Sequence, residues 1–188
     1  AAWNTTSTSV HHCVIYECFQ GIAAAGPPYV SHLDIHHCTF YASNRYGAIG
    51  SESSGRVRVT NSIVAQMGSL RIAALTGHAG GDHNCLWHTA VPYGPGWNGS
   101  ETGQAGSHDI QSDPQFISRD PAHPSFLGIT ADSPAATAGT DGGYIGAFPP
   151  VQAPGAGPVA NTINVRDFGA RGDGQHDDAP AIQAAVLL

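Results

Sequence analysis

The chain has 188 residues, with 24 glycines, 13 prolines and only 11% charged residues, a composition typical of turn-rich β-structure. Its net charge is −7 and its 7 basic residues, all arginine, form no cluster, so we expect neither a nucleic-acid partner nor attraction to an anionic membrane. No apolar run is long enough to span a bilayer, and membrane insertion is therefore not expected. The start of the chain is not typical of a signal peptide, and we expect it to lie inside a coil of a repeated structure.

A five-residue motif recurs at intervals of 25, 24 and 23 residues, beginning at His11, His36, Thr60 and His83. Its third positions are predicted to form one column, which consists of Cys13, Cys38, Ser62 and Cys85. Its fifth positions are large and apolar and are predicted to form a second column inside the core: Ile15, Phe40, Val64 and Trp87. Three places before the first column come Val10, Ile35 and Val59, and there the fourth copy departs with Asp82.

A period in the low twenties without a helical apolar pattern predicts a solenoid of short parallel strands. Each copy would be one coil, with like residues stacked about 4.8 Å apart. We expect regular coils over residues 10–22, 30–49 and 57–75, separated by loops rich in glycine, proline and serine. The predicted fold class is therefore all-β, a parallel β-helix. The alternative is chance similarity among four apolar runs.

Beyond the fourth copy the pattern loosens. Residues 88–112 are interpreted as one long excursion from the stack, and they include Tyr93 and Trp97. Aromatic residues in such a glycine-rich loop suit stacking against sugars, so both are candidate carbohydrate-binding residues; packing over the solenoid is the alternative. Residues 107–148 consist of short apolar segments between turn residues, and we expect them to cover the end of the last coil.

The clearest boundary is an uncharged segment of proline, glycine and alanine at residues 149–162, which is typical of a linker. The predicted organisation is thus coils and closing segment at 1–148, the linker, and a cap-like segment at 163–188. In that last segment, residues 163–168 alternate like a strand. Asp177 or Asp178 is then predicted to cap a helix.

Histidines are the most suggestive candidate ligands. The repeat places His11 over His36 and His12 over His37, and pairs of imidazoles on neighbouring coils can bind a metal ion. The alternative is a polar ladder that lines a turn. A second, looser cluster consists of His78, Asp82, His83 and His88.

The remaining titratable residues indicate neither a disulfide bond nor a catalytic site. A disulfide bond between Cys13 and Cys38 is geometrically conceivable, but reduced and buried thiols are the favoured interpretation. Glycoside hydrolysis needs two carboxylates about 5–10 Å apart, and the repeat does not supply such a pair. Glu17 stacks on alanine and glutamine, and Asp34 stacks on serine and arginine. No cofactor is evident from the residues themselves.

Two segments resemble known families. Residues 164–185, which read NVRDFGARGDGQHDDAPAIQAA, are similar to the opening of pectin lyase-like right-handed parallel β-helix proteins, where a strand and a helix cap the first coil. Residues 112–116, 133–135 and 145–147 resemble the closing segment of secreted bacterial β-helix proteins, many of which process polysaccharides. The second resemblance departs at Ala136-Thr137, where that family has an acidic residue.

These resemblances imply a right-handed β-helix, an extracellular or cell-surface location, a polysaccharide partner and, in some relatives, calcium. Our leading hypothesis is an extracellular module of a polysaccharide-processing or polysaccharide-binding protein. If it belongs to an enzyme, that enzyme would be a polysaccharide lyase or glycoside hydrolase with its active site outside this chain. The alternative is a non-catalytic structural or adhesive module of a surface fibre, filament or tailspike.

The order of the two resemblances is inverted, because a closing segment precedes an opening one. Three explanations follow from this order. The chain is a fragment that spans two tandem β-helices, or residues 163–188 cap its own first coil, or they cap the first coil of another copy. The last case would build a head-to-tail homopolymer.

Overall fold

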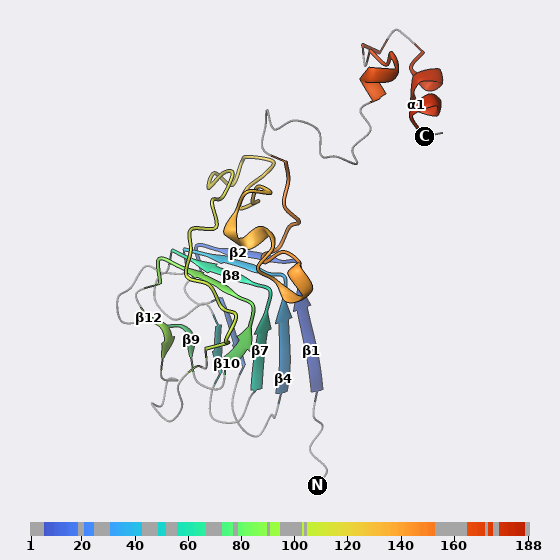
Figure 1. The fold of residues 1–188 in the computed structure, drawn as a ribbon. Coiled ribbons are helices and arrows are strands. Elements are labelled where there is room, and N and C mark those ends of the chain that lie inside the picture. Colours follow the sequence, from blue (N-terminus) through green and yellow to red (C-terminus); the bar gives the residue numbers. More distant parts are fainter. Residues whose placement is uncertain are drawn as a thin grey trace. The chain divides into compact units, whose positions relative to one another are not determined.

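A computed structural model describes most of the chain, and the described residues are 6–18, 21–24, 31–42, 49–51, 56–66, 73–76, 79–89, 91–94, 103, 105–152, 165–171, 173–174 and 177–186. The chain divides into two compact units, Ala1–Gln152 and Ala153–Leu188. The first unit consists of strands and a long closing loop, and the second holds two short helical segments (Figure 1).

The first unit contains three parallel sheets of four strands each. The first sheet has the order β1-β4-β7-β10, with the bounds Thr6–His11, Ser31–His36, Arg56–Thr60 and Ala79–Asp82. The second has the order β2-β5-β8-β11, with the bounds Val14–Tyr16, Thr39–Tyr41, Ile63–Ala65 and Cys85–Trp87. The third has the order β3-β6-β9-β12, with the bounds Ile22–Ala24, Ile49–Ser51, Ala73–Thr76 and Val91–Gly94.

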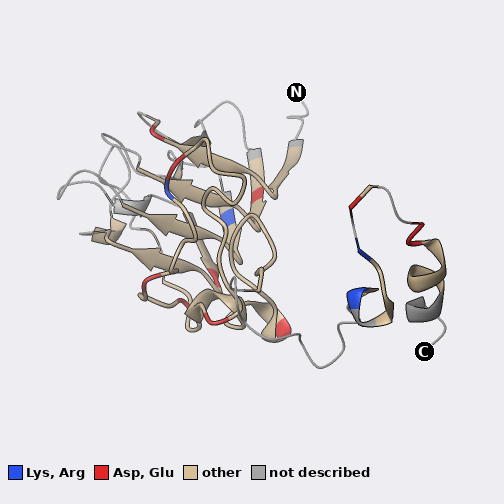
Figure 2. Cartoon of the chain, turned by 90° about the horizontal axis from the view of Figure 1, so that it is seen from above, with Lys and Arg blue, Asp and Glu red and all other residues tan. Residues whose placement is uncertain are grey.

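Each sheet therefore receives one strand from each successive repeat of the chain. We number these repeats 1 to 4 and define them as residues 6–24, 31–51, 56–76 and 79–94. The prediction of mostly β-structure with parallel strands is confirmed. Charged positions are scattered over strands and loops, and the described part of the chain has no basic band (Figure 2).

The predicted columns are correct for repeats 1 to 3 but wrong by one residue in repeat 4. Ile15, Phe40 and Val64 share a register position as expected. In repeat 4, however, Leu86 rather than Trp87 pairs with Val64, and Cys85 pairs with Ile63. The position above Ser62 therefore belongs to Asn84 instead of Cys85.

Hydrogen bonding explains this choice of register. The Asn84 side chain is fully buried; its Oδ1 accepts from the Ser62 amide at 3.1 Å, and its Nδ2 donates to the Val59 carbonyl at 2.9 Å. Ser62 Oγ in turn accepts from the Cys38 amide at 3.1 Å. Asparagine and serine thus satisfy buried backbone groups at the corner, which a thiol would do poorly because S–H is a weak donor and sulfur a weak acceptor.

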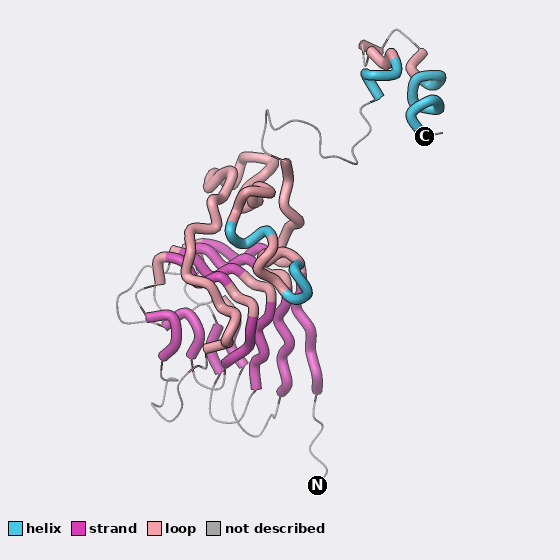
Figure 3. The backbone as a smooth tube through the Cα atoms, in the orientation of Figure 1, coloured by secondary structure: helices cyan, strands magenta, loops and turns pink. Residues whose placement is uncertain are grey.

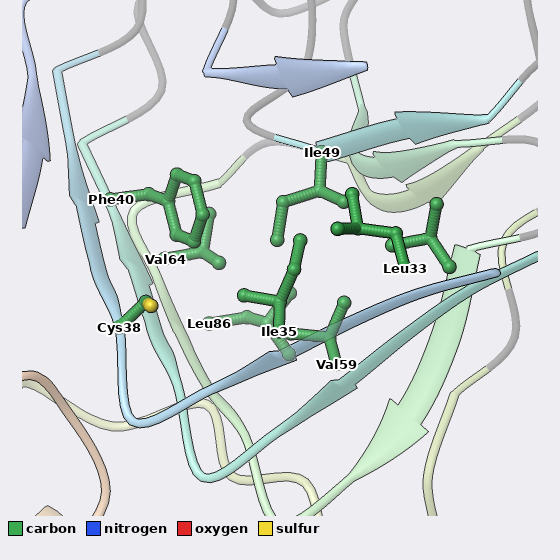
Figure 4. Close-up of a cluster of buried hydrophobic side chains, with 9 residues drawn as sticks. Leu33, Ile35, Cys38, Phe40, Ile49, Val59, Val64 and Leu86 are labelled. Carbon is green, nitrogen blue, oxygen red and sulfur yellow. The ribbon is translucent and has the colours of Figure 1, made fainter. Parts of the chain in front are cut away.

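Apolar side chains from all three sheets meet in one core (Figure 4). Its fully buried members include Ile35 from the first sheet, Phe40 and Val64 from the second, and Ile49 from the third. Removing a large side chain of this kind from water contributes about 1.5–3 kcal/mol. The alternation of inward and outward residues along each strand therefore joins the three sheets into one unit.

The stack also extends further than the sequence suggested. Residues 88–112 are not one long excursion, because Val91–Gly94 forms β12 in the third sheet and Ile110 pairs with Cys85. The Ile110 amide donates to the Asn84 carbonyl at 2.7 Å, and its carbonyl accepts from the Leu86 amide at 2.9 Å. Residues 105–112 thus begin a further repeat, which we call repeat 5.

The closing segment runs along the side of the stack rather than over its end. It contains the short 3-10 helices η1 (Pro134–Ala136) and η2 (Thr140–Gly142), and it is the pink loop with two cyan turns that lies above the magenta strands in Figure 3. Its Ile129, Ala135 and Ile145 pack against the outward side chains of the second sheet, Ile63 among them. Because this sheet is apolar on both faces, its outer face also needs a cover.

The four cysteines are free thiols, so Cys13 and Cys38 form no disulfide bond. Cys38 and Cys85 are buried as expected, whereas Cys13 is exposed. Burial raises the pKa of the Cys38 thiol to about 11 and that of Cys85 to about 12. The two buried thiols therefore stay protonated at neutral pH.

The second unit confirms the predicted helix and corrects the predicted strand. Helix α1 spans Ala179–Val186, and Asp177 Oδ1 accepts from the Ala179 amide at 3.0 Å. Val165–Phe168, expected as a strand, is the 3-10 helix η3. A single strand has no partner for its backbone among the described residues 165–186, so a local helix satisfies these groups better.

Residues 153–164, which include most of the predicted linker, lie outside the described residues. Nothing in the described helices has the length and apolarity of a membrane span.

Candidate functional site

The candidate site lies at the corner between the first and second sheets. One residue of each repeat adopts a left-handed conformation here: His12 (φ 53°), His37 (φ 50°), Asn61 (φ 50°) and His83 (φ 58°). Asparagine and histidine are among the non-glycine residues that enter this region most readily. The corner therefore presents a row of polar side chains in the same position of successive repeats, which we call the corner row.

The predicted histidine pairs stack as the repeat requires. The His11 and His36 rings are 5.0 Å apart with an interplanar angle of 15°, and the His12 and His37 rings are 5.2 Å apart at 8°. Neighbours along the chain also approach each other, since His11 Nδ1 and His12 Nδ1 lie 3.1 Å apart. Four imidazoles thus gather on repeats 1 and 2.

The closing segment covers part of this group. Tyr144 places its hydroxyl 3.3 Å from His12 Nε2, and its ring centroid lies 4.7 Å from that of His37. Asn61 Nδ2 lies 3.5 Å from His37 Nε2. The polar-ladder interpretation predicts contacts of this kind, in which the imidazoles bond to neighbouring repeats and to the cover.

Burial and neighbouring imidazoles both disfavour protonation here. Desolvation, followed by the charges of His11 and His12, lowers the pKa of His36. Desolvation, followed by His12 and His36, lowers the pKa of His37. Both rings are therefore neutral at neutral pH and retain a free lone pair, as a metal ligand must.

Three possible ligand atoms, however, converge around another member of the corner row, His83. Within the described residues, the one group of three or more possible ligands whose donor atoms lie within 4.8 Å of one another is Asp82, His83 and His108. The stacked histidines bring two nitrogens together, His11 Nδ1 and His12 Nδ1 at 3.1 Å, but no third possible ligand atom joins them among the described residues. Metal binding by His11, His12, His36 and His37 therefore stays a prediction. The geometry favours Asp82, His83 and His108, which share only Asp82 and His83 with the second cluster predicted from the sequence.

Of the two aromatic residues predicted to bind carbohydrate, the structure describes Tyr93 but not Trp97. Tyr93 lies on β12, is partly buried and packs against the core, and its hydroxyl donates to Asp109 Oδ2. Burial, together with this carboxylate, raises the pKa of Tyr93. These contacts favour packing over sugar stacking for Tyr93. Trp97 lies outside the described residues.

Sequence reasoning missed His108 and Asp109 as members of the repeat. Asp109 Oδ1 accepts from the Asn84 amide at 2.7 Å, and the His83 and His108 rings lie 4.5 Å apart. The missed signal is that Gly106-Ser107-His108-Asp109-Ile110 follows Gly81-Asp82-His83-Asn84-Cys85 at an interval of 25 residues. Recognising it requires the register of the fourth repeat to be correct.

Comparisons with profiles of known protein families, with curated proteins and with solved structures found no match to this chain.

Proposed function

We propose that this chain is a right-handed parallel β-helix module, of the pectin lyase-like kind, that binds polysaccharide on the outer face of its first sheet. Three parallel sheets that share one core and receive strands in a fixed cyclic order support the solenoid. The strong preference for right-handed crossovers between parallel strands supports its hand. The resemblance of residues 164–185 to a β-helix opening points in the same direction.

The observation that carries the binding proposal is an in-register row of exposed polar side chains. Ser9, Asp34 and Arg58 occupy one register position on β1, β4 and β7, and all are exposed. Parallel pairing spaces them about 4.8 Å apart. Hydroxyl, carboxylate and guanidinium groups side by side on a flat sheet can exchange hydrogen bonds with successive sugar hydroxyls or uronate groups.

The same row argues for binding rather than hydrolysis by these residues. Asp34 has serine and arginine as its register neighbours instead of a second carboxylate. Cleavage of a glycosidic bond by the usual hydrolytic route needs a carboxylate pair. In this proposal, any cleavage would be performed by parts of the protein beyond this chain, and the module would hold the polymer at an extracellular or cell-surface location.

Affinity electrophoresis through gels that contain pectin, alginate or β-glucan tests the proposal. We expect at least one polymer to retard the wild-type chain, and we expect Asp34→Ala and Arg58→Ala to abolish that retardation. Gln66→Ala, on a different face of the repeat, is the matched control and should migrate like the wild type. Equal mobility of the wild type in all gels, or retention of binding by both row variants, would exclude this surface.

The inverted order of the two resemblances, a closing segment followed by an opening one in the second unit, favours the alternative of a structural or adhesive module. A head-to-tail homopolymer through this unit predicts that deletion of residues 153–188 converts polymers to monomers in light scattering. A monomeric full chain would exclude head-to-tail assembly and leave the polysaccharide proposal untouched.

A further inference from the structure

A carboxylate and two imidazoles meet where repeats 4 and 5 adjoin. Asp82 ends strand β10, His83 follows it at the corner, and His108 belongs to repeat 5. Asp82 Oδ2 and His108 Nδ1 lie 2.7 Å apart, and the centroids of the two imidazole rings are 4.5 Å apart. One possible ligand atom from each of the three residues lies within 4.8 Å of the others.

The backbone holds this cluster in place. Asp82 Oδ1 accepts from the His83 amide at 3.0 Å and from the His108 amide at 2.8 Å. Its other carboxylate oxygen therefore stays directed towards the imidazole of His108. The chain also approaches itself closely here, because a Cβ atom at Gly106 would come within 2.4 Å of the Gly81 carbonyl oxygen.

His83 adds an independent observation. Its Nδ1 atom is buried and, like that of His37, has no hydrogen-bond partner among the described residues. A buried polar atom without a partner is costly and calls for an explanation such as a bound ion. Asp82 and His108, by contrast, leave 38% and 62% of their side chains exposed, so an ion could enter from solvent and retain water as a further ligand.

We propose that Asp82, His83 and His108 bind a divalent first-row transition metal ion, with Zn²⁺ as the best fit. Zn²⁺ binds imidazole nitrogen and carboxylate oxygen at about 2.0–2.2 Å, so that neighbouring ligand atoms in a tetrahedral site lie about 3.3 Å apart. That spacing lies between the 2.7 Å and 4.8 Å limits of the cluster. Small movements of exposed side chains are enough to complete the site.

The donor set discriminates among ions. Calcium takes six to eight oxygen ligands, whereas two of the three donors here are imidazole nitrogens. Imidazole suits zinc, copper, nickel and iron. Aspartate is ordinarily ionised throughout the neutral range, so Asp82 can serve as an anionic ligand.

A metal ion at this position would fasten repeat 5 to repeat 4. His108 lies 26 residues from Asp82 in the sequence, and the β-pairing described between these repeats is an isolated bridge between Cys85 and Ile110. Binding to the folded state alone raises stability. At one hundred times Kd we expect Zn²⁺ to raise Tm by roughly 5–10 °C.

The test is calorimetric titration of ZnCl₂ into the chelator-stripped full chain, prepared without a histidine tag, together with thermal unfolding. We expect one ion per chain and a rise in Tm that Ca²⁺ does not reproduce. His83→Gln and His108→Gln should each weaken binding by at least about 100-fold, because even loss of a residue that only supports a ligand costs 10–100-fold. His108 is exposed, so its variant should fold normally.

The matched control is the double variant His12→Gln/His37→Gln, which alters the stacked histidines and leaves the cluster intact. It should bind Zn²⁺ like the wild type. Loss of binding in this control but not in His108→Gln would transfer the site to the stacked histidines and overturn the inference. So would the absence of any Zn²⁺-dependent heat or Tm change. Neither result depends on polysaccharide binding, which is measured separately.

Discussion

Asn84→Ala tests the register on which the fold and the proposed metal site both depend. In the structure the side-chain amide of Asn84 is completely buried. It accepts a hydrogen bond from the Ser62 N–H and donates one to the Val59 carbonyl. Alanine would leave both backbone groups without this partner inside the core. Each orphaned buried group costs about 1–3 kcal/mol, so for two groups we expect a loss of roughly 2–6 kcal/mol in the free energy of unfolding.

Urea unfolding followed by tryptophan fluorescence measures this loss. All 3 tryptophans precede residue 153, so the signal reports on the first unit alone. The variant should lower the midpoint without changing the slope, which is proportional to the surface exposed on unfolding. Gln66→Ala is the matched control, because it removes an amide whose hydrogen bond to His88 is exposed.

The alternative register makes a different prediction. If Cys85 stacked on Ser62, Asn84 would occupy the exposed corner beside Asn61, and truncating it would cost no more than about 0.5 kcal/mol. Equal stability of Asn84→Ala and Gln66→Ala would therefore refute the register described above.

Three further predictions concern the core, the thiols and pH. Phe40→Ala should cost about 3–5 kcal/mol in urea unfolding, and a loss below about 1 kcal/mol would place this ring outside the core. Cys38 and Cys85 should resist alkylation in the native chain near pH 8 while the other two cysteines react; rapid labelling of all four would contradict their burial. Because the pKa values of His36 and His37 are lowered in the folded chain, the unfolded chain binds more protons, so stability should be complete above about pH 6.5 and fall below it. Thermal unfolding at several pH values measures this, and a His36→Gln/His37→Gln variant that kept the full pH dependence would assign it to other groups.

The sequence predicted the positions of the strands better than the register between successive repeats. The motif interval was sufficient to locate β2, β5 and β8, because their central apolar residues point into a shared core. It was not sufficient for the fourth repeat, where we aligned Cys85 by its similarity to Cys38. The structure selects Asn84 instead, because that position must satisfy backbone groups. Residue type alone does not report this hydrogen-bonding requirement.

The need for a cover on the second sheet could also be predicted in part from the sequence. Residues Ile63-Val64-Ala65 are all buried, and such an uninterrupted apolar run is typical of a strand covered on both faces. A strand with one face in solvent would alternate, as Arg56–Thr60 does. The sequence did not predict which segment covers this outer face. Contacts such as that between Thr39 and Ala147 join residues that lie 108 positions apart.

The one-residue shift in repeat 4 also determines what its polar residues can do. In the alignment by cysteines, Asp82 falls in the inward column of Val10, Ile35 and Val59. In the structure Gly81 occupies that column, and Asp82 pairs with Thr60. Because successive strand residues point to opposite faces, the shift moves a carboxylate from the core to the surface. Only there can it meet His108, so the register that makes Asn84 a structural residue also makes Asp82 available as a ligand.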